Sequence, residues 1–352
     1  YVFPGASHNR FEHSLGVYHL AKEYIQILNT DNQFAEKDIK CITIGALVHD
    51  LGHGPYSHLF DELVPKENNH ENRSYQLFRH MNQKYSFGFQ EDELLFIRNV
   101  IQPKHILSDK KYLYQIVSNV NGVDVDRFDY LMRDISMIGL NYGIEYKRIM
   151  KHSKIENQEI IYSSKVKQNI EDFFRTRTIM YKEVYNHHTV RAIEFMIQEF
   201  LKLSEPLFGI SIIIKNHIWD TFIQYTDSMI DLIYFIPFVD ESLIQLVQRI
   251  RKRELYTLIG EVYSDTKIVE PENNEIYITD VIHIRSHGDK QCQYYQMKQT
   301  NDITTEVTNE KYVTSVYIKQ NENIEQGEKV FQDIQTKIQC QRNLPIQVRH
   351  SP

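Results

Sequence analysis

The stretch that decides the fold is Val48-His49-Asp50-Leu51-Gly52-His53-Gly54-Pro55. It closes an almost continuously apolar run, Ile39 to Leu51, which predicts a buried helix that ends at Gly52 because Gly54-Pro55 prevents its continuation. Adjacent His and Asp side chains at a buried helix end are costly unless they are paired or bind a metal ion. Imidazole nitrogen and carboxylate oxygen suit a divalent ion. The dipeptide alone leaves two interpretations open, a helix-capping His–Asp hydrogen bond and a metal site.

Composition excludes several classes of protein. The chain has 352 residues, of which 41% are apolar and 25% charged, so it can bury a large core and is not disordered throughout. Its net charge of −7 disfavours nucleic-acid binding through bulk charge, which would need a local basic patch. No run approaches the ~18 apolar residues that span a bilayer, so we expect no membrane partner. The chain begins without Met at Tyr1, and we expect a longer protein around it.

The cysteines indicate a reducing compartment. Cys41, Cys292 and Cys340 are spaced neither as a disulfide framework nor as a zinc site. We therefore expect an intracellular protein of the nucleus or cytoplasm.

Hydrophobic periodicity predicts a mainly α protein, with a helical core and a smaller C-terminal α+β lobe. Glu205-Pro206 is expected to break the helical pattern, which divides the chain into a core (1–205), a helical bridge (206–253) and a C-terminal lobe (254–352). Asn157-Gln158 predicts the turn of a small hairpin within 155–162. We expect helices over 15–28, 39–51, 70–85, 91–101, 123–138, 166–186, 189–203, 219–235, 239–251 and 324–340, and strands over 255–263, 276–284, 293–298 and 313–319.

Two further segments carry the same residue types. His8-Asn9-Arg10-Phe11-Glu12-His13-Ser14 lies upstream, and the segment from Asp124 to Asp134 lies downstream. On a helix, Asp126, Asp129 and Asp134 lie with Tyr130 within about one third of the circumference. Carboxylates that share a face repel one another unless a cation lies nearby. The alternative, an exposed acidic face, is disfavoured because the intervening apolar residues predict a mostly buried helix.

The order His13, His49-Asp50, Asp126 resembles the metal pattern of the HD-domain phosphohydrolases. The resemblance is closer still to the deoxynucleoside triphosphate triphosphohydrolases that carry a sterile-alpha-motif domain before the HD domain. It rests on Phe3-Pro4-Gly5-Ala6-Ser7-His8-Asn9-Arg10-Phe11-Glu12-His13-Ser14-Leu15-Gly16, His49-Asp50-Leu51-Gly52-His53-Gly54-Pro55, Val117-Ser118-Asn119, Gly122-Val123-Asp124-Val125-Asp126 and Asp129-Tyr130. These motifs are long and specific, dense to about residue 205 and sparse beyond it.

The resemblance implies an enzyme that hydrolyses a dNTP to a deoxynucleoside and inorganic triphosphate. One divalent ion (iron, manganese, zinc or magnesium) would be held by His13, His49, Asp50 and Asp126, and a further magnesium ion would bridge the nucleotide phosphates. The catalytic group would be His58, Asp61 and His70. His58 and Asp61 lie three residues apart, so we expect the carboxylate to favour protonated His58, the form that a general acid needs.

Further positions would hold the substrate. By resemblance, Arg10, Arg127 and Arg177 contact phosphates, Tyr185 lies against the deoxyribose, Asp134 takes the 3′-hydroxyl and Asn186 approaches the base edge. His53 and Tyr130 complete this set. We expect Arg177, Tyr181, Tyr185 and His188 to form one helical stripe, with an ordinary amphipathic helix as the alternative. The family has His at the position of Tyr181 and Gln at that of Asn186.

The resemblance also implies activation by GTP or dNTP and assembly into a homo-oligomer, from dimer to tetramer. The activator pocket would be lined by Val2, Phe3, Arg148, His187 and Arg253. We expect one chain not to bring all of these distant positions together, so that the pocket forms between chains. His188 and Thr257 stand where family members carry lysines that hold the activator.

Two other functions stay open. The first is another HD-domain phosphohydrolase, acting on nucleoside monophosphates or cyclic nucleotides. The second is a non-catalytic nucleotide sensor or single-stranded nucleic-acid binder, which the negative net charge does not favour.

Overall fold

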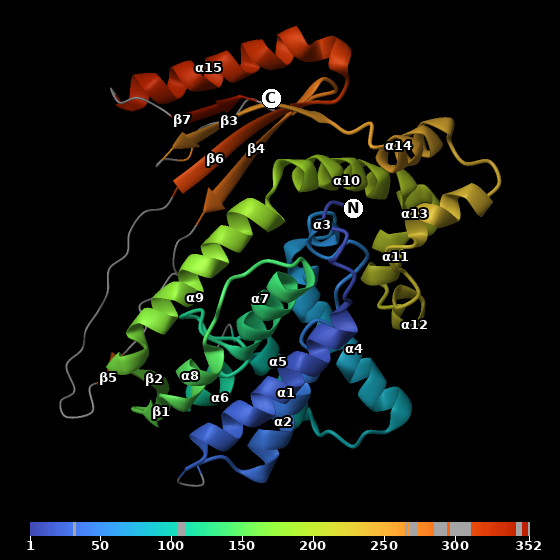
Figure 1. Cartoon of the computed structure of the whole chain (residues 1–352). Helices are drawn as coiled ribbons and strands as arrows, with labels where there is room; N and C mark the ends of the chain where they lie inside the picture. The colour runs from blue at the N-terminus through green and yellow to red at the C-terminus, as the bar shows by residue number, and fades with distance from the viewer. Residues whose placement is uncertain are drawn as a thin grey trace.

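The computed structural model describes residues 1–30, 33–103, 110–264, 267, 273–284, 294–295, 311–342 and 347–350. A body of packed helices carries a four-stranded sheet and one long helix at one end (Figure 1). The prediction of a mainly α protein with a helical core is confirmed. Within the described residues, no helix is both long and apolar enough to cross a membrane.

Six of the longer helices form the helical core: α1 (Arg10–Leu28), α2 (Glu36–Val48), α4 (His70–Tyr85), α5 (Glu91–Ile101), α7 (Val125–Met137) and α9 (Lys167–Ile179). Val17 of α1, Ile42 of α2, Phe128 of α7 and Phe173 of α9 belong to one continuous buried cluster. Shorter elements connect them: α3 (His58–Asp61), η1 (Lys66–Asn68), α6 (Tyr112–Gln115), α8 (Tyr146–Lys151), β1 (Ser153–Glu156), β2 (Glu159–Ser163) and η2 (Ser164–Val166).

Side-chain caps fix where three of these helices begin. Asn9 accepts a hydrogen bond from the backbone N–H of Glu12 at the start of α1, and Asn69 caps α4 in the same way. Fully buried Asp124 caps α7 by accepting from the N–H of Arg127. Such caps satisfy N–H groups that have no partner inside the helix. Each cap precedes a first turn that carries residues predicted for the site.

The hairpin prediction is confirmed. Strands β1 and β2 pair antiparallel, and Asn157 and Gln158 form the turn with φ of 49° and 64°. Strand β5 (Tyr294–Tyr295) adds to β2 in parallel; the rest of the strand predicted over 293–298 lies outside the described residues.

The predicted helix over 166–186 contains a feature that periodicity did not indicate. Helix α9 continues into a π-helical turn, Met180–Tyr185, before α10 (His188–Phe208) begins. A π-turn has more residues per turn than an α-helix, so side chains beyond it are rotated relative to those before it.

The predicted break at Glu205-Pro206 is wrong. Helix α10 includes Pro206 and ends at Gly209, which adopts the left-handed conformation with φ of 59°. Pro206 lacks the N–H that would bond to the carbonyl of Lys202, and the helix ends two residues beyond it. The expected domain boundary at residue 205 therefore falls inside a helix.

The helical bridge is divided into more short helices than predicted. It consists of α11 (Ile210–Lys215), α12 (Trp219–Phe222), α13 (Met229–Leu232), η4 (Ile233–Phe235) and α14 (Glu241–Lys252). The single helix predicted over 219–235 is wrong, because a turn interrupts it where Thr226 and Ser228 bond to each other at 2.7 Å. The apolar side chains Trp219, Phe222 and Met229 nevertheless pack into the cluster formed with α10.

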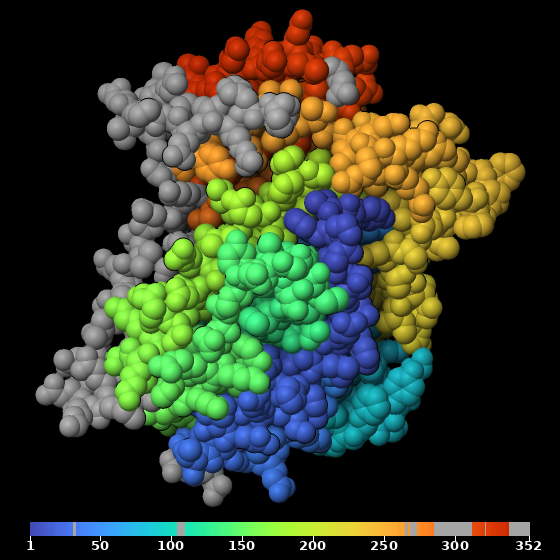
Figure 2. Space-filling model, viewed as in Figure 1, coloured from blue at the N-terminus to red at the C-terminus, as the bar shows by residue number. Residues whose placement is uncertain are grey.

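The C-terminal lobe is an antiparallel sheet in the order β4-β6-β3-β7, with β3 (Thr257–Ser264), β4 (Tyr277–Ile284), β6 (Lys311–Ile318) and β7 (Gln347–His350). After η5 (Asn321–Asn323), α15 (Ile324–Arg342) lies across one face, where Phe331 packs on Val262 and Val316. Phe195 of α10 packs on Tyr317 from the other face, so the sheet lies between α15 and the helical body (Figures 1 and 2).

Candidate active site

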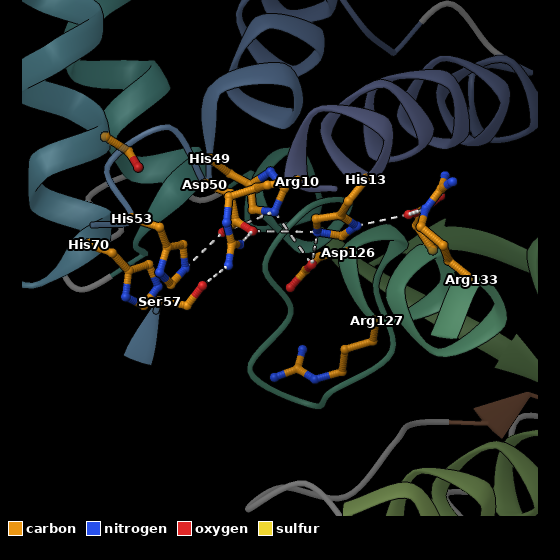
Figure 3. A network of polar contacts seen from close by, with 12 residues as sticks. Arg10, His13, His49, Asp50, His53, Ser57, His70, Asp126, Arg127 and Arg133 are labelled. Carbon is orange, nitrogen blue, oxygen red and sulfur yellow. Dashed lines mark hydrogen bonds and ion pairs between the residues drawn. The ribbon is translucent and has the colours of Figure 1, made fainter. Parts of the chain in front are cut away.

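Three segments distant in sequence bring their polar ends together (Figure 3). The first turn of α1 supplies His13, the end of α2 supplies His49 and Asp50, and the first turn of α7 supplies Asp126. Asp126 Oδ1 lies 3.2 Å from His13 Nε2 and 3.4 Å from His49 Nε2. Asp50 Oδ1 lies 3.4 Å from the same His49 nitrogen, and its Oδ2 lies 3.6 Å from His13 Nε2.

This arrangement fits a divalent metal ion. Donor atoms that contact one ion at about 2.0–2.2 Å lie about 3 Å from one another, close to the separations seen here. His49 Nδ1 bonds to the carbonyl of Ala46 at 2.8 Å, whereas its buried Nε2 makes no hydrogen bond. Atoms of His13, His49 and Asp126 lie within 4.8 Å of one another. Asp50 lies at the edge of this group, where its carboxylate also pairs with Arg10.

Without an ion, protons balance the charge of this buried cluster. Burial disfavours protonation of His13, but hydrogen bonds to Asp126 and Asp129 outweigh it and raise the pKa to about 9. Burial also disfavours protonation of His49, but the negative charge of Asp50 and the neighbouring Asp126 outweigh it and raise the pKa of His49. Burial alone would raise the pKa values of Asp50 and Asp126. The neighbouring histidines outweigh it and hold both pKa values below the ordinary value. A divalent cation can replace these protons, as metal binding at histidine sites generally does.

A second cluster, His53, His58, Asp61 and His70, lies beside the first. Its donor atoms also lie within 4.8 Å of one another. However, the rings of His53 and His70 are stacked, with centroids 3.9 Å apart and planes 16° apart. Nitrogen lone pairs lie in the ring plane, so two stacked rings cannot both direct them at one ion. The geometry therefore favours an acid–base group over a second metal site.

The protonation of His58 differs from the sequence prediction. Burial and the neighbouring His70 lower its pKa, and the charge of Asp61 does not compensate. Asp61 does favour protonated His58, as expected, but burial and His70 outweigh its charge in the free protein. Asp61 is itself bonded to His70 and Arg73, which overcome its burial and lower its pKa to about 2.

Arg73 and Gly52 hold the loop that carries the second cluster. Arg73 is 1% exposed, and it donates to the carbonyl of Gly52 at 2.8 Å and to Asp61 at 2.5 Å. The N–H of Gly52 donates to Ser74 Oγ at 2.8 Å. A Cβ at Gly52 would lie 2.2 Å from the backbone nitrogen of Ser74, so only glycine permits this approach to α4.

The bridge fixes the same loop from the other side. Tyr56 and Ser57 have φ of 59° and 56°, a region that non-glycine residues rarely adopt. Asp227 accepts from the N–H of Tyr56 at 2.7 Å, and its backbone carbonyl accepts from the Tyr56 hydroxyl at 2.6 Å. Such strain persists only where the surroundings hold it. This contact therefore sets the position of His58, which follows directly.

Two of the three arginines predicted to contact phosphate, Arg10 and Arg127, have different surroundings. Arg10 lies between the clusters and bonds to Asp50 and to Ser57 Oγ. Arg127 pairs instead with Asp124, the cap of α7. Arg10 is thus the cation that the structure places between the two clusters.

Further along α7 lies a third group of the predicted residues. Asp134 Oδ2 accepts from the Tyr185 hydroxyl at 2.6 Å, and its Oδ1 lies 2.7 Å from His8 Nε2. Arg177 bonds to the Tyr130 side chain, which is one turn after Asp126. Asp126, Tyr130 and Asp134 follow at intervals of four residues, so one face of α7 runs from the metal cluster to this group.

The single stripe predicted along α9 is wrong. The π-turn separates its members: Arg177 and Tyr185 face α7, whereas Tyr181 packs with Tyr263 against Ile282, Ile284 and Val313 of the sheet. Asn186 donates from its side-chain amide to the carbonyl of Tyr181 at 2.7 Å, which turns that amide back onto the π-turn.

Several of the predicted activator positions lie close to one another within one chain. Arg253 donates to the carbonyl of Tyr1 at 2.6 Å, next to Val2, and the rings of Phe3 and His187 are 6.3 Å apart. The N-terminal segment thus lies beside the start of α10 and the end of α14. Arg148 is exposed on α8, so the expectation that one chain does not gather all five positions stays a prediction.

Sequence reasoning missed several residues of the site. Arg73, His8 and Ser57 were assigned no role, although each contacts a predicted residue. Asp227 was also assigned none, although it holds Tyr56 in the loop before His58. Only His8 had a local signal, since it lies in the quoted upstream motif. Tyr56 and Asp227 are 171 positions apart, and no short-range pattern could indicate their contact.

Comparisons with known proteins agree with this geometry. Residues 10–134 match the HD domain family, and residues 144–287 match the HD associated region. The chain is 34% identical over 278 residues to the deoxynucleoside triphosphate triphosphohydrolase SAMHD1 homolog of Dictyostelium discoideum, covering 76% of this chain and 54% of that protein. It is 32% identical over 323 residues to SAMHD1 of Bos taurus, covering 78% and 54%, and 31% identical over 307 residues to SAMHD1 of Homo sapiens, covering 74% and 49%. The chain thus spans about half the length of these relatives, and the resemblance found in the sequence is confirmed.

Proposed function

The chain belongs to the HD-domain family, and from that premise we propose that it is a metal-dependent triphosphohydrolase that converts a dNTP to a deoxynucleoside and inorganic triphosphate. The observation that carries the proposal is the adjacency of two unlike clusters. His13, His49 and Asp126 fit a divalent ion, and stacked His53 and His70 lie beside them with Asp61. The names of the relatives support the choice of substrate.

His13, His49, Asp50 and Asp126 would hold the ion, which would polarise a phosphate oxygen and lower the pKa of bound water. Arg10, between the clusters, would bond a phosphate oxygen through its guanidinium. Hydrolysis breaks the bond between the α-phosphorus and the 5′-oxygen, and that oxygen leaves with a proton. His58 would donate this proton from the second cluster, and His70, bonded to Asp61, would keep the carboxylate in place.

His58 can act as a general acid only after the substrate has bound. Burial lowers its pKa in the free protein, so it is mostly neutral at pH 7. Negative phosphates beside an imidazole favour its charged form. We therefore infer that bound triphosphate raises the pKa of His58 and supplies the protonated state that the leaving group needs.

The third group would recognise the sugar. The Tyr185 ring would occupy the space of a 2′-hydroxyl, and Asp134, held by Tyr185 and His8, would accept from the 3′-hydroxyl. Arg177 and Tyr130 would contact phosphates, and a magnesium ion would bridge those phosphates. Arg127 would reach a phosphate only by giving up its pairing with Asp124. His53 would line the phosphate site, and Asn186 would present its amide oxygen to the base.

We also infer activation by self-association. Val2, Phe3, His187 and Arg253 form one surface of the monomer, and Arg148 lies exposed on α8. A GTP or dNTP that bridges these cations in two chains would bind the assembly better than the monomer. Binding would then shift the population toward a dimer or tetramer.

Asp126→Asn is expected to abolish turnover while the fold is retained, because the metal ligand loses its charge but keeps its shape. Products formed from dGTP with Mn²⁺ would be separated by anion-exchange chromatography, with Asp92→Asn, an exposed carboxylate of α5, as the matched control. The wild type and the control should release deoxyguanosine and triphosphate. Release of pyrophosphate or phosphate would support a different HD-domain phosphohydrolase. Binding without any product would support a nucleotide sensor. Equal turnover by Asp126→Asn would contradict the metal assignment.

Tyr185→Ala is expected to lower the ratio of turnover rates on dGTP and GTP about tenfold or more, because removal of the ring opens space for a 2′-hydroxyl. Tyr185→Phe keeps the ring, so the ratio should hold while 3′-hydroxyl recognition weakens. Tyr181→Ala is the matched control on the same π-turn. A ratio that is unchanged in Tyr185→Ala means that another group excludes ribonucleotides.

Arg148→Ala is expected to reduce nucleotide-promoted assembly, whereas Lys147→Ala, its exposed neighbour, should not. Sedimentation velocity with and without dGTP measures this effect, with activity followed in parallel. A wild-type protein that stays monomeric at full turnover would refute the activation proposal and leave the catalytic one standing.

A further inference from the structure

His13, one of the two histidines of the first cluster, has a further carboxylate on the side of its ring that faces away from that cluster. His13 Nδ1 lies 2.8 Å from Asp129 Oδ2, while its Nε2 points into the cluster. Asp129 lies one turn before Arg133 on α7 and three residues after Asp126. Helix α7 therefore supplies both carboxylates beside the His13 ring, Asp126 at Nε2 and Asp129 at Nδ1. A hydrogen bond at Nδ1 fixes the proton there and leaves the Nε2 lone pair available for a metal ion.

Asp129 is itself held in place. Arg133 Nε donates to Asp129 Oδ2 at 2.9 Å and Arg133 Nη2 donates to Oδ1 at 2.9 Å, a bidentate pair. Both partners are largely buried, with Asp129 at 9% and Arg133 at 24% side-chain exposure. Figure 3 shows Arg133 on the side of His13 away from Asp50. Planar pairing of this kind restricts the carboxylate to one orientation.

The facing helix leaves space for this pair. Gly16 lies inside α1, one turn after His13, where a Cβ would lie 1.8 Å from Asp129 Oδ1 and 2.6 Å from Arg133 Nη2. Its φ is not positive, so the backbone itself does not require glycine. Glycine is a poor residue for a helix interior, and its presence here has a packing reason.

We propose that Asp129, locked by Arg133 beneath Gly16, is the positioning residue that orients His13 and sets the metal affinity of the cluster. This inference rests on the proposed metal site. Loss of such an outer partner typically costs 10–100-fold in metal affinity. Asp129 acts through His13 and contacts neither substrate nor ion.

The test measures the affinity of the metal-free protein for Co²⁺ alone, by competition with a chromophoric chelator. Asp129→Asn should bind Co²⁺ 10–100-fold more weakly and shift the visible Co²⁺ absorption, because the ring is no longer held by a carboxylate. Gly16→Ala removes no polar group, yet it should also weaken Co²⁺ binding by displacing Asp129. Glu12→Gln is the matched control, since the Glu12 carboxylate lies 3.8 Å from Arg133 Nη1, whereas the carboxylate that bonds His13 Nδ1 is that of Asp129.

Thermal unfolding of each metal-free variant accompanies the titration, and Gly16→Ala keeps the inference testable if Asp129→Asn unfolds. Wild-type affinity and spectrum in both folded variants would overturn the positioning role while leaving the metal site intact. A wild-type protein that does not bind Co²⁺ would overturn the metal site and this inference together.

Discussion

Two carboxylates and two imidazoles with side-chain exposures of only 10–33% meet where α1, α2 and α7 converge. The balance of their charges determines much of the surrounding structure. Unpaired charges in such a place are costly, so each must find a partner. In the free protein, protons on His13 and His49 are the partners of the carboxylates, as the raised pKa values of these histidines indicate. The outer partners, Arg10 on Asp50 and Asp129 on His13, follow from the same requirement.

The second cluster depends on a different constraint, a strained loop held from both sides. Arg73 and Gly52 join the loop to α4, and Asp227 joins it to the bridge. Hydrogen bonds to Asp227 and Arg10 thus hold Tyr56 and Ser57 in an unfavourable backbone region, directly before His58. The bridge, remote in sequence, thereby takes part in the geometry of the candidate active site.

Local sequence signals predicted a substantial part of this structure. The helices that carry the site begin at side-chain caps or follow regular apolar spacing. The proposed metal ligands lie in short motifs of His and Asp, residue types that are typical of metal sites. Whatever depends on distant contacts could not be predicted. The lowered pKa of His58 follows from its burial beside His70, the orientation of Tyr181 from a π-turn, and the grouping of Phe3 with His187 from the path of the N-terminal segment.

The central claim is that the first cluster binds the ion and the second performs acid–base chemistry. Anomalous scattering from crystals of the protein loaded with Mn²⁺, recorded on both sides of the manganese absorption edge, tests this directly. The account predicts one anomalous peak bonded to His13, His49, Asp50 and Asp126, and none at the stacked rings of His53 and His70. A peak at the second cluster, or none at the first, would contradict it.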